Sequence, residues 1–140
     1  NLTIGTITAE ELKKNVASAC PLKEELTAEA KGRDLVSGLP KTVPVTSAEI
    51  RDALRESLVT IIDGIKSVLE KTPPELAADI FESGIVLTGG GSTLRGLGRL
   101  INVNTEIPIF IAESPMECVA TGCGHTLEEI KTLRSILISN

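Results

Sequence analysis

The sequence is poor in aromatic residues, with two Phe and no Trp or Tyr. Any core that it forms must therefore be aliphatic. Proteins that bind single-stranded nucleic acid use aromatic stacking platforms beside a basic groove. This chain offers neither, because its 19 acidic residues outnumber its 14 basic residues and give a formal net charge of −5. We expect no nucleic-acid partner.

Cysteine and histidine are also scarce. Cys20, Cys118 and Cys123 form no CxxC pair, and His125 is the one histidine. An odd number of separated cysteines favours a reducing, cytoplasmic compartment over a disulfide framework. So few sulfur and imidazole ligands argue against a zinc site. Cys118 and Cys123 are then typical of small core residues, and His125 of a helix surface.

The sequence lacks an apolar run long enough to span a membrane, and it lacks the basic and apolar segments of a signal peptide. A starting Met is missing too. Residues 1–5 look like the end of a strand or loop, so we interpret the chain as a fragment. Its 140 residues suffice for one domain or two small lobes.

The most informative stretch is residues 84–98. An apolar run at 85–87 precedes three glycines at 89–91, and leucines then recur at helical spacing. This pattern predicts a buried strand, a turn, and a helix that begins near Ser92 or Thr93. A strand without polar alternation is expected to be covered on both faces, as in a mostly parallel sheet flanked by helices.

The three glycines allow two interpretations. Glycine lets the backbone approach a ligand closely, and the amides of a following helix favour negative charge. Parallel sheets also bind ligands beyond the carboxyl ends of their strands. However, the turn has neither the dinucleotide-binding spacing nor the lysine of a P-loop. Spacing alone leaves open a nucleotide or phosphate contact and a turn needed only for tight packing.

Upstream, Thr8 as N-cap and Glu11 in a capping box predict a helix that ends near Cys20. Leu12 and Val16 are spaced for its buried face. Residues 26–31 then alternate with a period of two, which predicts a half-exposed strand, and residues 22–45 as a whole predict a small meander lobe. We expect a turn at 32–34, extended pieces at 35–36 with 38–40 and at 42–45, and an edge position for Pro44. The lobe is either a packing appendage or a part that closes a cleft or meets another subunit.

The remainder alternates helices and strands, which is typical of the α/β class. Ser47 is the expected N-cap of the longest helix, which runs to about Lys71 with a broad apolar stripe. Pro74 begins a short helix, residues 106–112 form a strand, and Pro115 opens another helix. The chain then ends in an amphipathic segment with apolar residues at Leu127, Ile130, Leu133, Ile136 and Leu137.

Five blocks of sequence together resemble the MreB family of bacterial actins, in the family's order and across nearly the whole chain. The blocks are residues 8–13, 32–42, 70–80, 84–91 and 118–120. The resemblance implies an actin-like, ribonuclease H-like α/β half with a small β-rich outer subdomain. It places residues 1–20 at the start of the inner subdomain with a helix at the adenine side. Residues 21–46 would form the outer subdomain, and 47–140 the inner subdomain with the adenosine loop.

The resemblance also implies which residues bind the nucleotide. From spacing alone, Glu10 and Lys13 are typical of a solvated helix face. In the family, this segment lies against the adenine and ribose, and the glycine turn is the adenosine loop. The implied binding residues are Glu10, Glu11, Leu12, Lys13, Gly89, Gly90, Gly91 and Ser92. No catalytic residue or metal ligand is among them, because the family's phosphate loops and Mg²⁺ residues lie upstream and in the other domain.

The function implied is that of a fragment of an actin-family ATPase that binds ATP or ADP with Mg²⁺ and polymerises into membrane-associated filaments controlling bacterial cell shape. Expected partners are other copies in the filament, the first domain of the same protein and a membrane-anchored adaptor at the inner face of the membrane. The fragment alone is not expected to hydrolyse ATP. Departures from the family at Thr6, Ile7, Cys20 and 121–125 indicate a divergent paralogue.

Two alternatives remain open at this point, because a fold does not fix a function. The chain could belong to another actin-superfold ATPase, of the sugar kinase or chaperone type. It could also be an interaction module with a vestigial nucleotide site.

Overall fold

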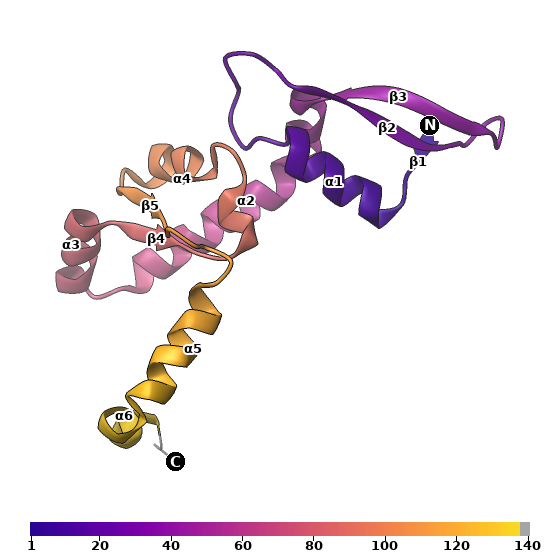
Figure 1. Ribbon diagram of the computed structural model, residues 1–140. Helices are drawn as coiled ribbons and strands as arrows, with labels where there is room; N and C mark the ends of the chain where they lie inside the picture. The colour runs from indigo at the N-terminus through magenta and orange to yellow at the C-terminus, as the bar shows by residue number, and fades with distance from the viewer. Residues whose placement is uncertain (138–140) are drawn as a thin grey trace.

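The computed structural model describes residues 1–137. A long helix, α2, joins a small three-stranded sheet at one end to a two-stranded sheet with its helices at the other (Figure 1). The elements are β1 (Leu2–Thr3), α1 (Thr6–Val16), β2 (Thr27–Asp34), β3 (Pro40–Thr46), α2 (Ser47–Lys71), α3 (Pro74–Ser83), β4 (Ile85–Leu87), the 3₁₀ turn η1 (Gly90–Thr93), α4 (Leu97–Thr105), β5 (Ile109–Ile111), α5 (Cys118–Glu128) and α6 (Ile130–Leu137).

The small sheet is antiparallel in the order β1-β2-β3, and β3 is an edge strand, as expected from Pro44. The predicted turn at 32–34 is wrong, because these residues belong to β2. Gly32 is required there by close strand packing, since a Cβ on it would lie 2.3 Å from the carbonyl oxygen of Thr3. The chain turns instead at 35–37, predicted to be partly extended, where the Asp34 carboxylate accepts two backbone amides.

Helix α1 begins two residues before the predicted N-cap. Gly5 is the N-cap, Thr8 lies within the helix, and no side chain caps its start. The helix ends at Val16 because the following residues are extended and pair with the chain near Arg95. Its buried face contains Leu12 and Val16, as predicted. Since α1 packs on β2 and β1 pairs with β2, residues 1–16 lie with the small sheet, and the subdomain boundary at residue 20 stays an expectation.

Helix α2 has the predicted bounds, but its N-cap is Thr46. Thr46 and Glu49 form a reciprocal capping box, in which each side chain accepts the other residue's backbone amide. Ser47, the predicted cap, is fully buried instead. Its hydroxyl accepts the Leu26 amide at 2.9 Å and donates to the carboxylate of Glu25. The start of α2 thereby holds the linker that enters the small sheet.

The second sheet consists of the parallel strands β4 and β5, with Ile85 opposite Ile109. One face packs against α2 and α4. The core there is an aliphatic cluster of Ala19, Leu58, Ile62, Leu97 and Ile101. The other face is open in the described part of the chain, where Val86 is 61% and Phe110 53% exposed. The expectation of strands covered on both faces is therefore wrong for residues 1–137.

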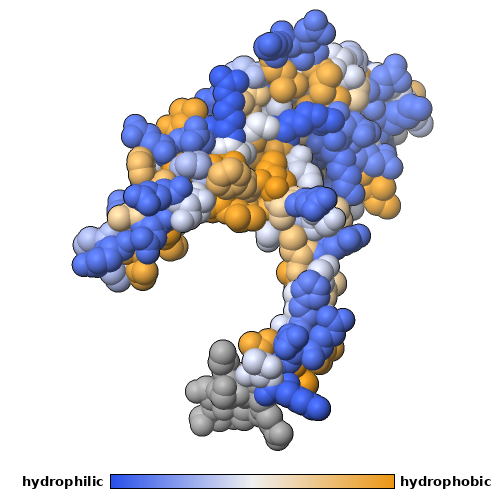
Figure 2. Space-filling model, turned by 60° about the vertical axis from the view of Figure 1, so that its left-hand side comes forward, coloured by the Kyte–Doolittle hydropathy of each residue, from blue (hydrophilic) through white to orange (hydrophobic). Residues whose placement is uncertain are grey.

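Helices α5 and α6 project away from the body (Figure 1). Helix α5 begins at Cys118 rather than at Pro115, because residues 114–117 form turns. The predicted core position of the thiols is wrong, since Cys118 is only half-buried and Cys123 is exposed. His125 lies on the helix surface, as predicted. Figure 2 shows a hydrophobic area at the centre of one face of the body, above the projecting helix α5.

Residues 138–140 of the predicted inner subdomain lie outside the described part, as do the side chains of Ile136 and Leu137. Within the described residues, no helix combines the length and the apolar composition needed to cross a bilayer.

The aliphatic cluster predicts the cost of a core truncation. Ile101 is 1% exposed, whereas Val103 on the same helix is 69% exposed. We expect Ile101→Ala to lower the free energy of unfolding by about 2–5 kcal/mol, because it removes buried methylene groups and leaves a cavity. Val103→Ala, the matched control, should change it by about 0.5 kcal/mol or less. Urea denaturation measures both, and equal midpoints for the two variants would contradict this account of the core.

Candidate functional site

The glycine turn follows β4 at the carboxyl edge of the two-stranded sheet. It forms the 3₁₀ turn η1, and α4 begins only at Leu97, so the expected helix start near Ser92 or Thr93 is wrong. The cause is local, because the amide and hydroxyl of Ser92 both donate to the carbonyl oxygen of Gly89, at 3.2 and 2.7 Å. Gly96, in the left-handed conformation, then redirects the chain into α4.

Two amides of this turn are available to a ligand. The Gly89 amide donates to the carbonyl oxygen of Pro115 at 2.6 Å, which joins the turns that follow β4 and β5. The amides of Gly90 and Gly91 have no hydrogen-bond partner among the described residues. A Cβ on either glycine would meet nothing within 4 Å, so both border open space. Adjacent free amides on an open surface can bind an anion.

Helix α1 presents an ion pair next to this turn. The ammonium group of Lys13 lies 2.5 Å from the carboxylate of Glu10, and that of Lys14 lies 3.6 Å from it. The hydrogen bond from Lys13 holds the pKa of Glu10 below its ordinary value. Glu10 is a carboxylate at neutral pH and is paired with a cation one helical turn away.

A cavity of about 730 Å³ lies between α1, α2 and the glycine turn. Glu10 and Lys13 line one side and Gly90 and Gly91 the other. Apolar side chains complete the wall, among them Leu54, Leu58, Ile61, Leu94 and Leu97. Free amides and cations beside an apolar surface suit a ligand with an apolar planar part and an anionic part.

The cavity thus brings together four of the eight predicted binding residues. The other four do not line it: Glu11 is exposed, Leu12 and Ser92 are buried, and the Gly89 amide is already bonded. All eight remain predicted binding residues. Sequence reasoning missed several lining residues, notably Lys14, Arg95 and Met116. Met116 could have been found from the rule that loops after parallel strands meet at one sheet edge.

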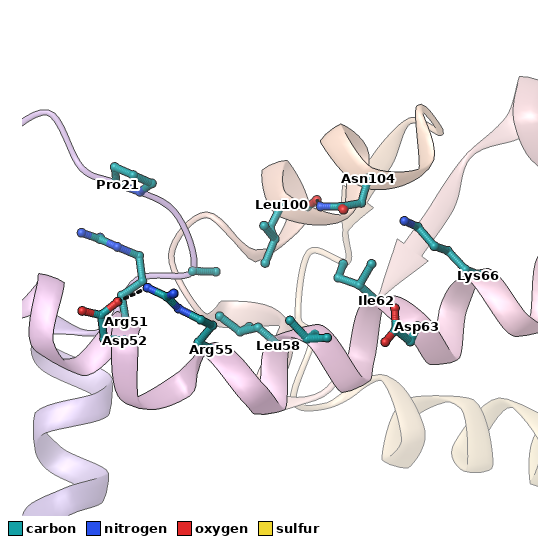
Figure 3. Close-up of a pocket in the computed structure, with 12 residues that line it drawn as sticks. Pro21, Arg51, Asp52, Arg55, Leu58, Ile62, Asp63, Lys66, Leu100 and Asn104 are labelled. Atoms are coloured by element: carbon teal, nitrogen blue, oxygen red, sulfur yellow. Dashed lines mark hydrogen bonds and ion pairs between the residues drawn. The ribbon is translucent and has the colours of Figure 1, made fainter.

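Two other cavities flank this one. The first, of about 490 Å³, lies between α2, α4 and the linker at Pro21 (Figure 3). Leu58 and Ile62 face Leu100 across it, and charged side chains of α2 stand at both ends. The second, of about 560 Å³, lies between α1, α2 and the small sheet and is mainly apolar. Neither contains a residue of the glycine turn.

Comparison with known proteins identifies the family. The family model described as "MreB/Mbl protein" matches residues 1–135. The chain belongs to the MreB/Mbl family. The match covers nearly the whole chain and confirms the resemblance to this family.

Named MreB/Mbl relatives are of similar sequence but greater length. The cell shape-determining protein Mbl of Bacillus subtilis is 46% identical over 132 residues, which cover 94% of this chain and 40% of that protein. The cell shape-determining protein MreB of Escherichia coli is 47% identical over 127 residues, which cover 91% of this chain and 37% of that protein. The chain therefore spans about 40% of the length of the MreB/Mbl proteins that it matches.

Solved structures confirm the actin-like α/β fold. MreB5 of Spiroplasma citri bound to ADP superposes with a TM-score of 0.91 at 37% identity, over 96% of this chain and 41% of that chain. MreB5 of the same organism bound to AMPPNP gives a TM-score of 0.90 at 36% identity, over 99% of this chain and 41% of that chain.

Among residues 1–137, no three His, Cys, Asp or Glu side chains lie together as a metal site would require.

Arg51 of α2, which lines the cavity at Pro21, binds the segment that follows α1. Its guanidinium donates to the hydroxyl of Ser18 at 2.8 Å, to the carbonyl oxygen of Cys20 at 3.0 Å and to the carboxylate of Glu25 at 2.7 Å. Hydrogen bonds from Arg51 and Ser47 hold the pKa of Glu25 below its ordinary value of 4.5. The linker between α1 and the small sheet is thereby tied to α2.

This lowered pKa predicts a pH dependence of stability. A carboxyl group whose folded pKa is depressed contributes its full stabilisation above its unfolded pKa, and loses it as the pH falls through the folded pKa. The difference in unfolding free energy between the native chain and Glu25→Gln should be largest at neutral pH and shrink below about pH 4.5. Chemical denaturation across this range measures it, with exposed Glu24→Gln as control. A difference constant from neutral to acidic pH would contradict the proposed contact.

Proposed function

We propose that this chain is the adenosine-binding part of an MreB/Mbl actin-family ATPase that assembles into filaments and helps to determine cell shape. The observation that carries the proposal is that Glu10 and Lys13 of α1 line the same cavity as Gly90 and Gly91 of the glycine turn. Family membership supports it, and the MreB5 relatives were solved with ADP and AMPPNP.

The residues of the cavity fit the parts of an adenine nucleotide. The apolar wall of Leu54, Ile61 and Leu94 offers a surface for a purine ring. Glu10, paired with Lys13, can accept hydrogen bonds from ribose hydroxyls. The free amides of Gly90 and Gly91 can donate to negatively charged or carbonyl-like oxygens.

Hydrolysis belongs to the intact protein in this proposal, and we expect a weak ATPase. Phosphoryl transfer depends on a metal-bound phosphate and a positioned water. The Mg²⁺ that accompanies the nucleotide would supply charge neutralisation at the phosphates, held by the family's phosphate loops outside this chain. The residues described here would bind and orient the adenosine and would take no part in proton transfer.

A nucleotide titration of the protein at its full natural length tests the proposal. We expect Lys13→Ala to weaken ADP binding about tenfold, because it removes the ammonium group that pairs with Glu10 beside the cavity, an effect comparable to losing one charge-assisted hydrogen bond. Lys23→Ala is the control, because Lys23 is exposed in the linker and does not line the cavity. The rise in melting temperature with millimolar ADP measures both variants. Equal shifts for the two would exclude Lys13 from the binding site.

The same titration separates the alternatives. A sugar kinase or chaperone is not favoured, since the named relatives are cell shape-determining proteins. An interaction module with a vestigial site would be indicated by a melting temperature that ADP and ATP leave unchanged.

We also propose that the outer subdomain contacts a neighbouring copy in the filament. The turn between β2 and β3 exposes three apolar side chains: Leu35 is 63%, Val36 83% and Leu39 65% exposed. Exposed apolar residues grouped at one tip are typical of a protein contact. A head-to-tail contact of this kind repeats and produces an open filament. We further expect this chain to contact the first domain of the same protein and a membrane-anchored adaptor. The filament would then lie at the inner face of the cytoplasmic membrane.

A charge at the tip should therefore hinder assembly. Val36→Glu in the protein at its full natural length is expected to raise the concentration needed for polymerisation several-fold, because a carboxylate in an apolar contact loses its hydration. Thr42→Glu, an exposed position in the body of β3, is the control. Sedimentation with nucleotide measures the polymer. Unchanged sedimentation of the Val36 variant would place the contact elsewhere.

A further inference from the structure

The two sides of the proposed nucleotide cavity come from distant parts of the chain and from different units of the fold. Lys13 lies on α1, which packs on the small sheet, whereas Gly90 and Gly91 follow β4 of the other sheet. No strand pairing joins the two sheets in the described residues. Helix α2 contacts both α1 and α4, and a second, direct contact joins α1 to the chain after the glycine turn.

Arg95 makes that contact with both its side chain and its backbone. Its guanidinium donates to the carbonyl oxygen of Lys14 at 3.1 Å and, less closely, to that of Ala17 at 3.4 Å. Its own carbonyl oxygen accepts the amide of Ala19 at 2.7 Å, and Ser18 forms a parallel bridge with it. One residue therefore holds both the last turn of α1 and the segment that follows it.

The charge of Arg95 suits this position. The last carbonyl groups of a helix have no partner within the helix and carry partial negative charge. The carbonyl of Lys14 is one of these groups, since α1 ends at Val16. A single nitrogen of the guanidinium, Nη1, donates to both carbonyl groups, and the shorter side chain of a lysine does not place its ammonium at the same position.

The packing around Gly96 makes the contact close. Gly96 has a φ of 76°, and a Cβ on it would lie 3.1 Å from the Cβ of Cys20 and 3.2 Å from its amide nitrogen. The segment opposite consists of small residues, with Ala17 and Ser18 at 0% exposure and Ala19 at 6%. The glycine turn and the end of α1 are therefore in direct contact through Arg95 and the residue that follows it.

We propose that Arg95 is a positioning residue for nucleotide binding, which fixes Glu10 and Lys13 relative to Gly90 and Gly91. This inference rests on the proposed function. Arg95 lies four residues beyond Gly91, and its guanidinium bonds the residue next to Lys13. Arg95→Ala keeps the backbone bonds to the segment after α1 but removes those from the guanidinium to the carbonyl groups of Lys14 and Ala17, so the two sides of the cavity are held by fewer contacts. A ligand that contacts both sides then has to order them on binding, which lowers its affinity.

The test compares two ligands in the protein at its full natural length, using Arg95→Ala, Arg95→Lys and the control Arg99→Ala. Arg99 is exposed on α4 and does not line the cavity. We expect Arg95→Ala to weaken ADP binding about tenfold, in line with the loss of one hydrogen bond to a charged group. Arg95→Lys should restore part of the affinity, and Arg99→Ala should match the native protein. Inorganic pyrophosphate has no adenosine and, under the proposed function, binds at the phosphate loops outside this chain, so its affinity should be the same in all four proteins.

Two results would overturn the inference. One is native ADP affinity in a folded Arg95→Ala protein. The other is an equal loss of affinity for ADP and pyrophosphate, which would indicate a general structural defect.

A measurement without nucleotide separates this inference from the proposed function. Hydrogen exchange of the Ala19 amide, which donates to the backbone of residue 95, should be faster in Arg95→Ala than in Arg99→Ala. If the native protein binds no ADP, but the Ala19 amide exchanges faster in Arg95→Ala, the proposed function is rejected and only a structural contact remains. If the native protein binds ADP, and Arg95→Ala changes neither the exchange rate nor the ADP affinity, only the role of Arg95 is rejected.

Discussion

The structure depends on the burial of one short extended segment, residues 17–20. Three of its residues are at most 6% exposed, and it lies between α2 on one side and the turn at Gly96 on the other. Arg51 bonds it from α2, and Arg95 bonds it from the glycine turn. Buried backbone groups must be hydrogen-bonded, and these bonds supply partners for the segment. The small sheet and the two-stranded sheet meet through this contact and α2.

The candidate site follows from this arrangement, because its functional groups lie on elements that the segment connects. The ion pair of Glu10 and Lys13 sits one to two turns before the segment on α1, and the free amides of Gly90 and Gly91 sit just before its partner Arg95. The cavity therefore lies between α1 and the glycine turn, and the contact of residues 17–20 with Arg95 sets the relative position of these two elements. The open face of β4 and β5, with Val86 and Phe110 exposed, belongs to a chain that spans about 40% of its matched relatives.

Sequence reasoning succeeded where one local pattern dominated. The bounds of α2, the strand β4 and the buried face of α1 followed from hydrophobic periodicity and helix stop signals, whereas β5 is shorter than the strand predicted at 106–112. It failed where a local pattern fitted two structures, as at the N-cap of α2 and at Gly32. Thr46 rather than Ser47 caps α2, because Ser47 is drawn into the contact with Glu25 and Leu26. Gly32 resembled a turn residue, yet it is a strand residue that the close approach of β1 requires.

The sequence by itself determined the family, the α/β class and the two segments that contribute to the candidate site, because these depend on local composition and on motifs in a fixed order. Only the tertiary structure decided that four of the eight predicted residues share one cavity and that Arg95 connects its two sides. The physical reason is distance along the chain. Residues 14 and 95 are 81 positions apart, and nothing in either local pattern encodes the hydrogen bond that joins them.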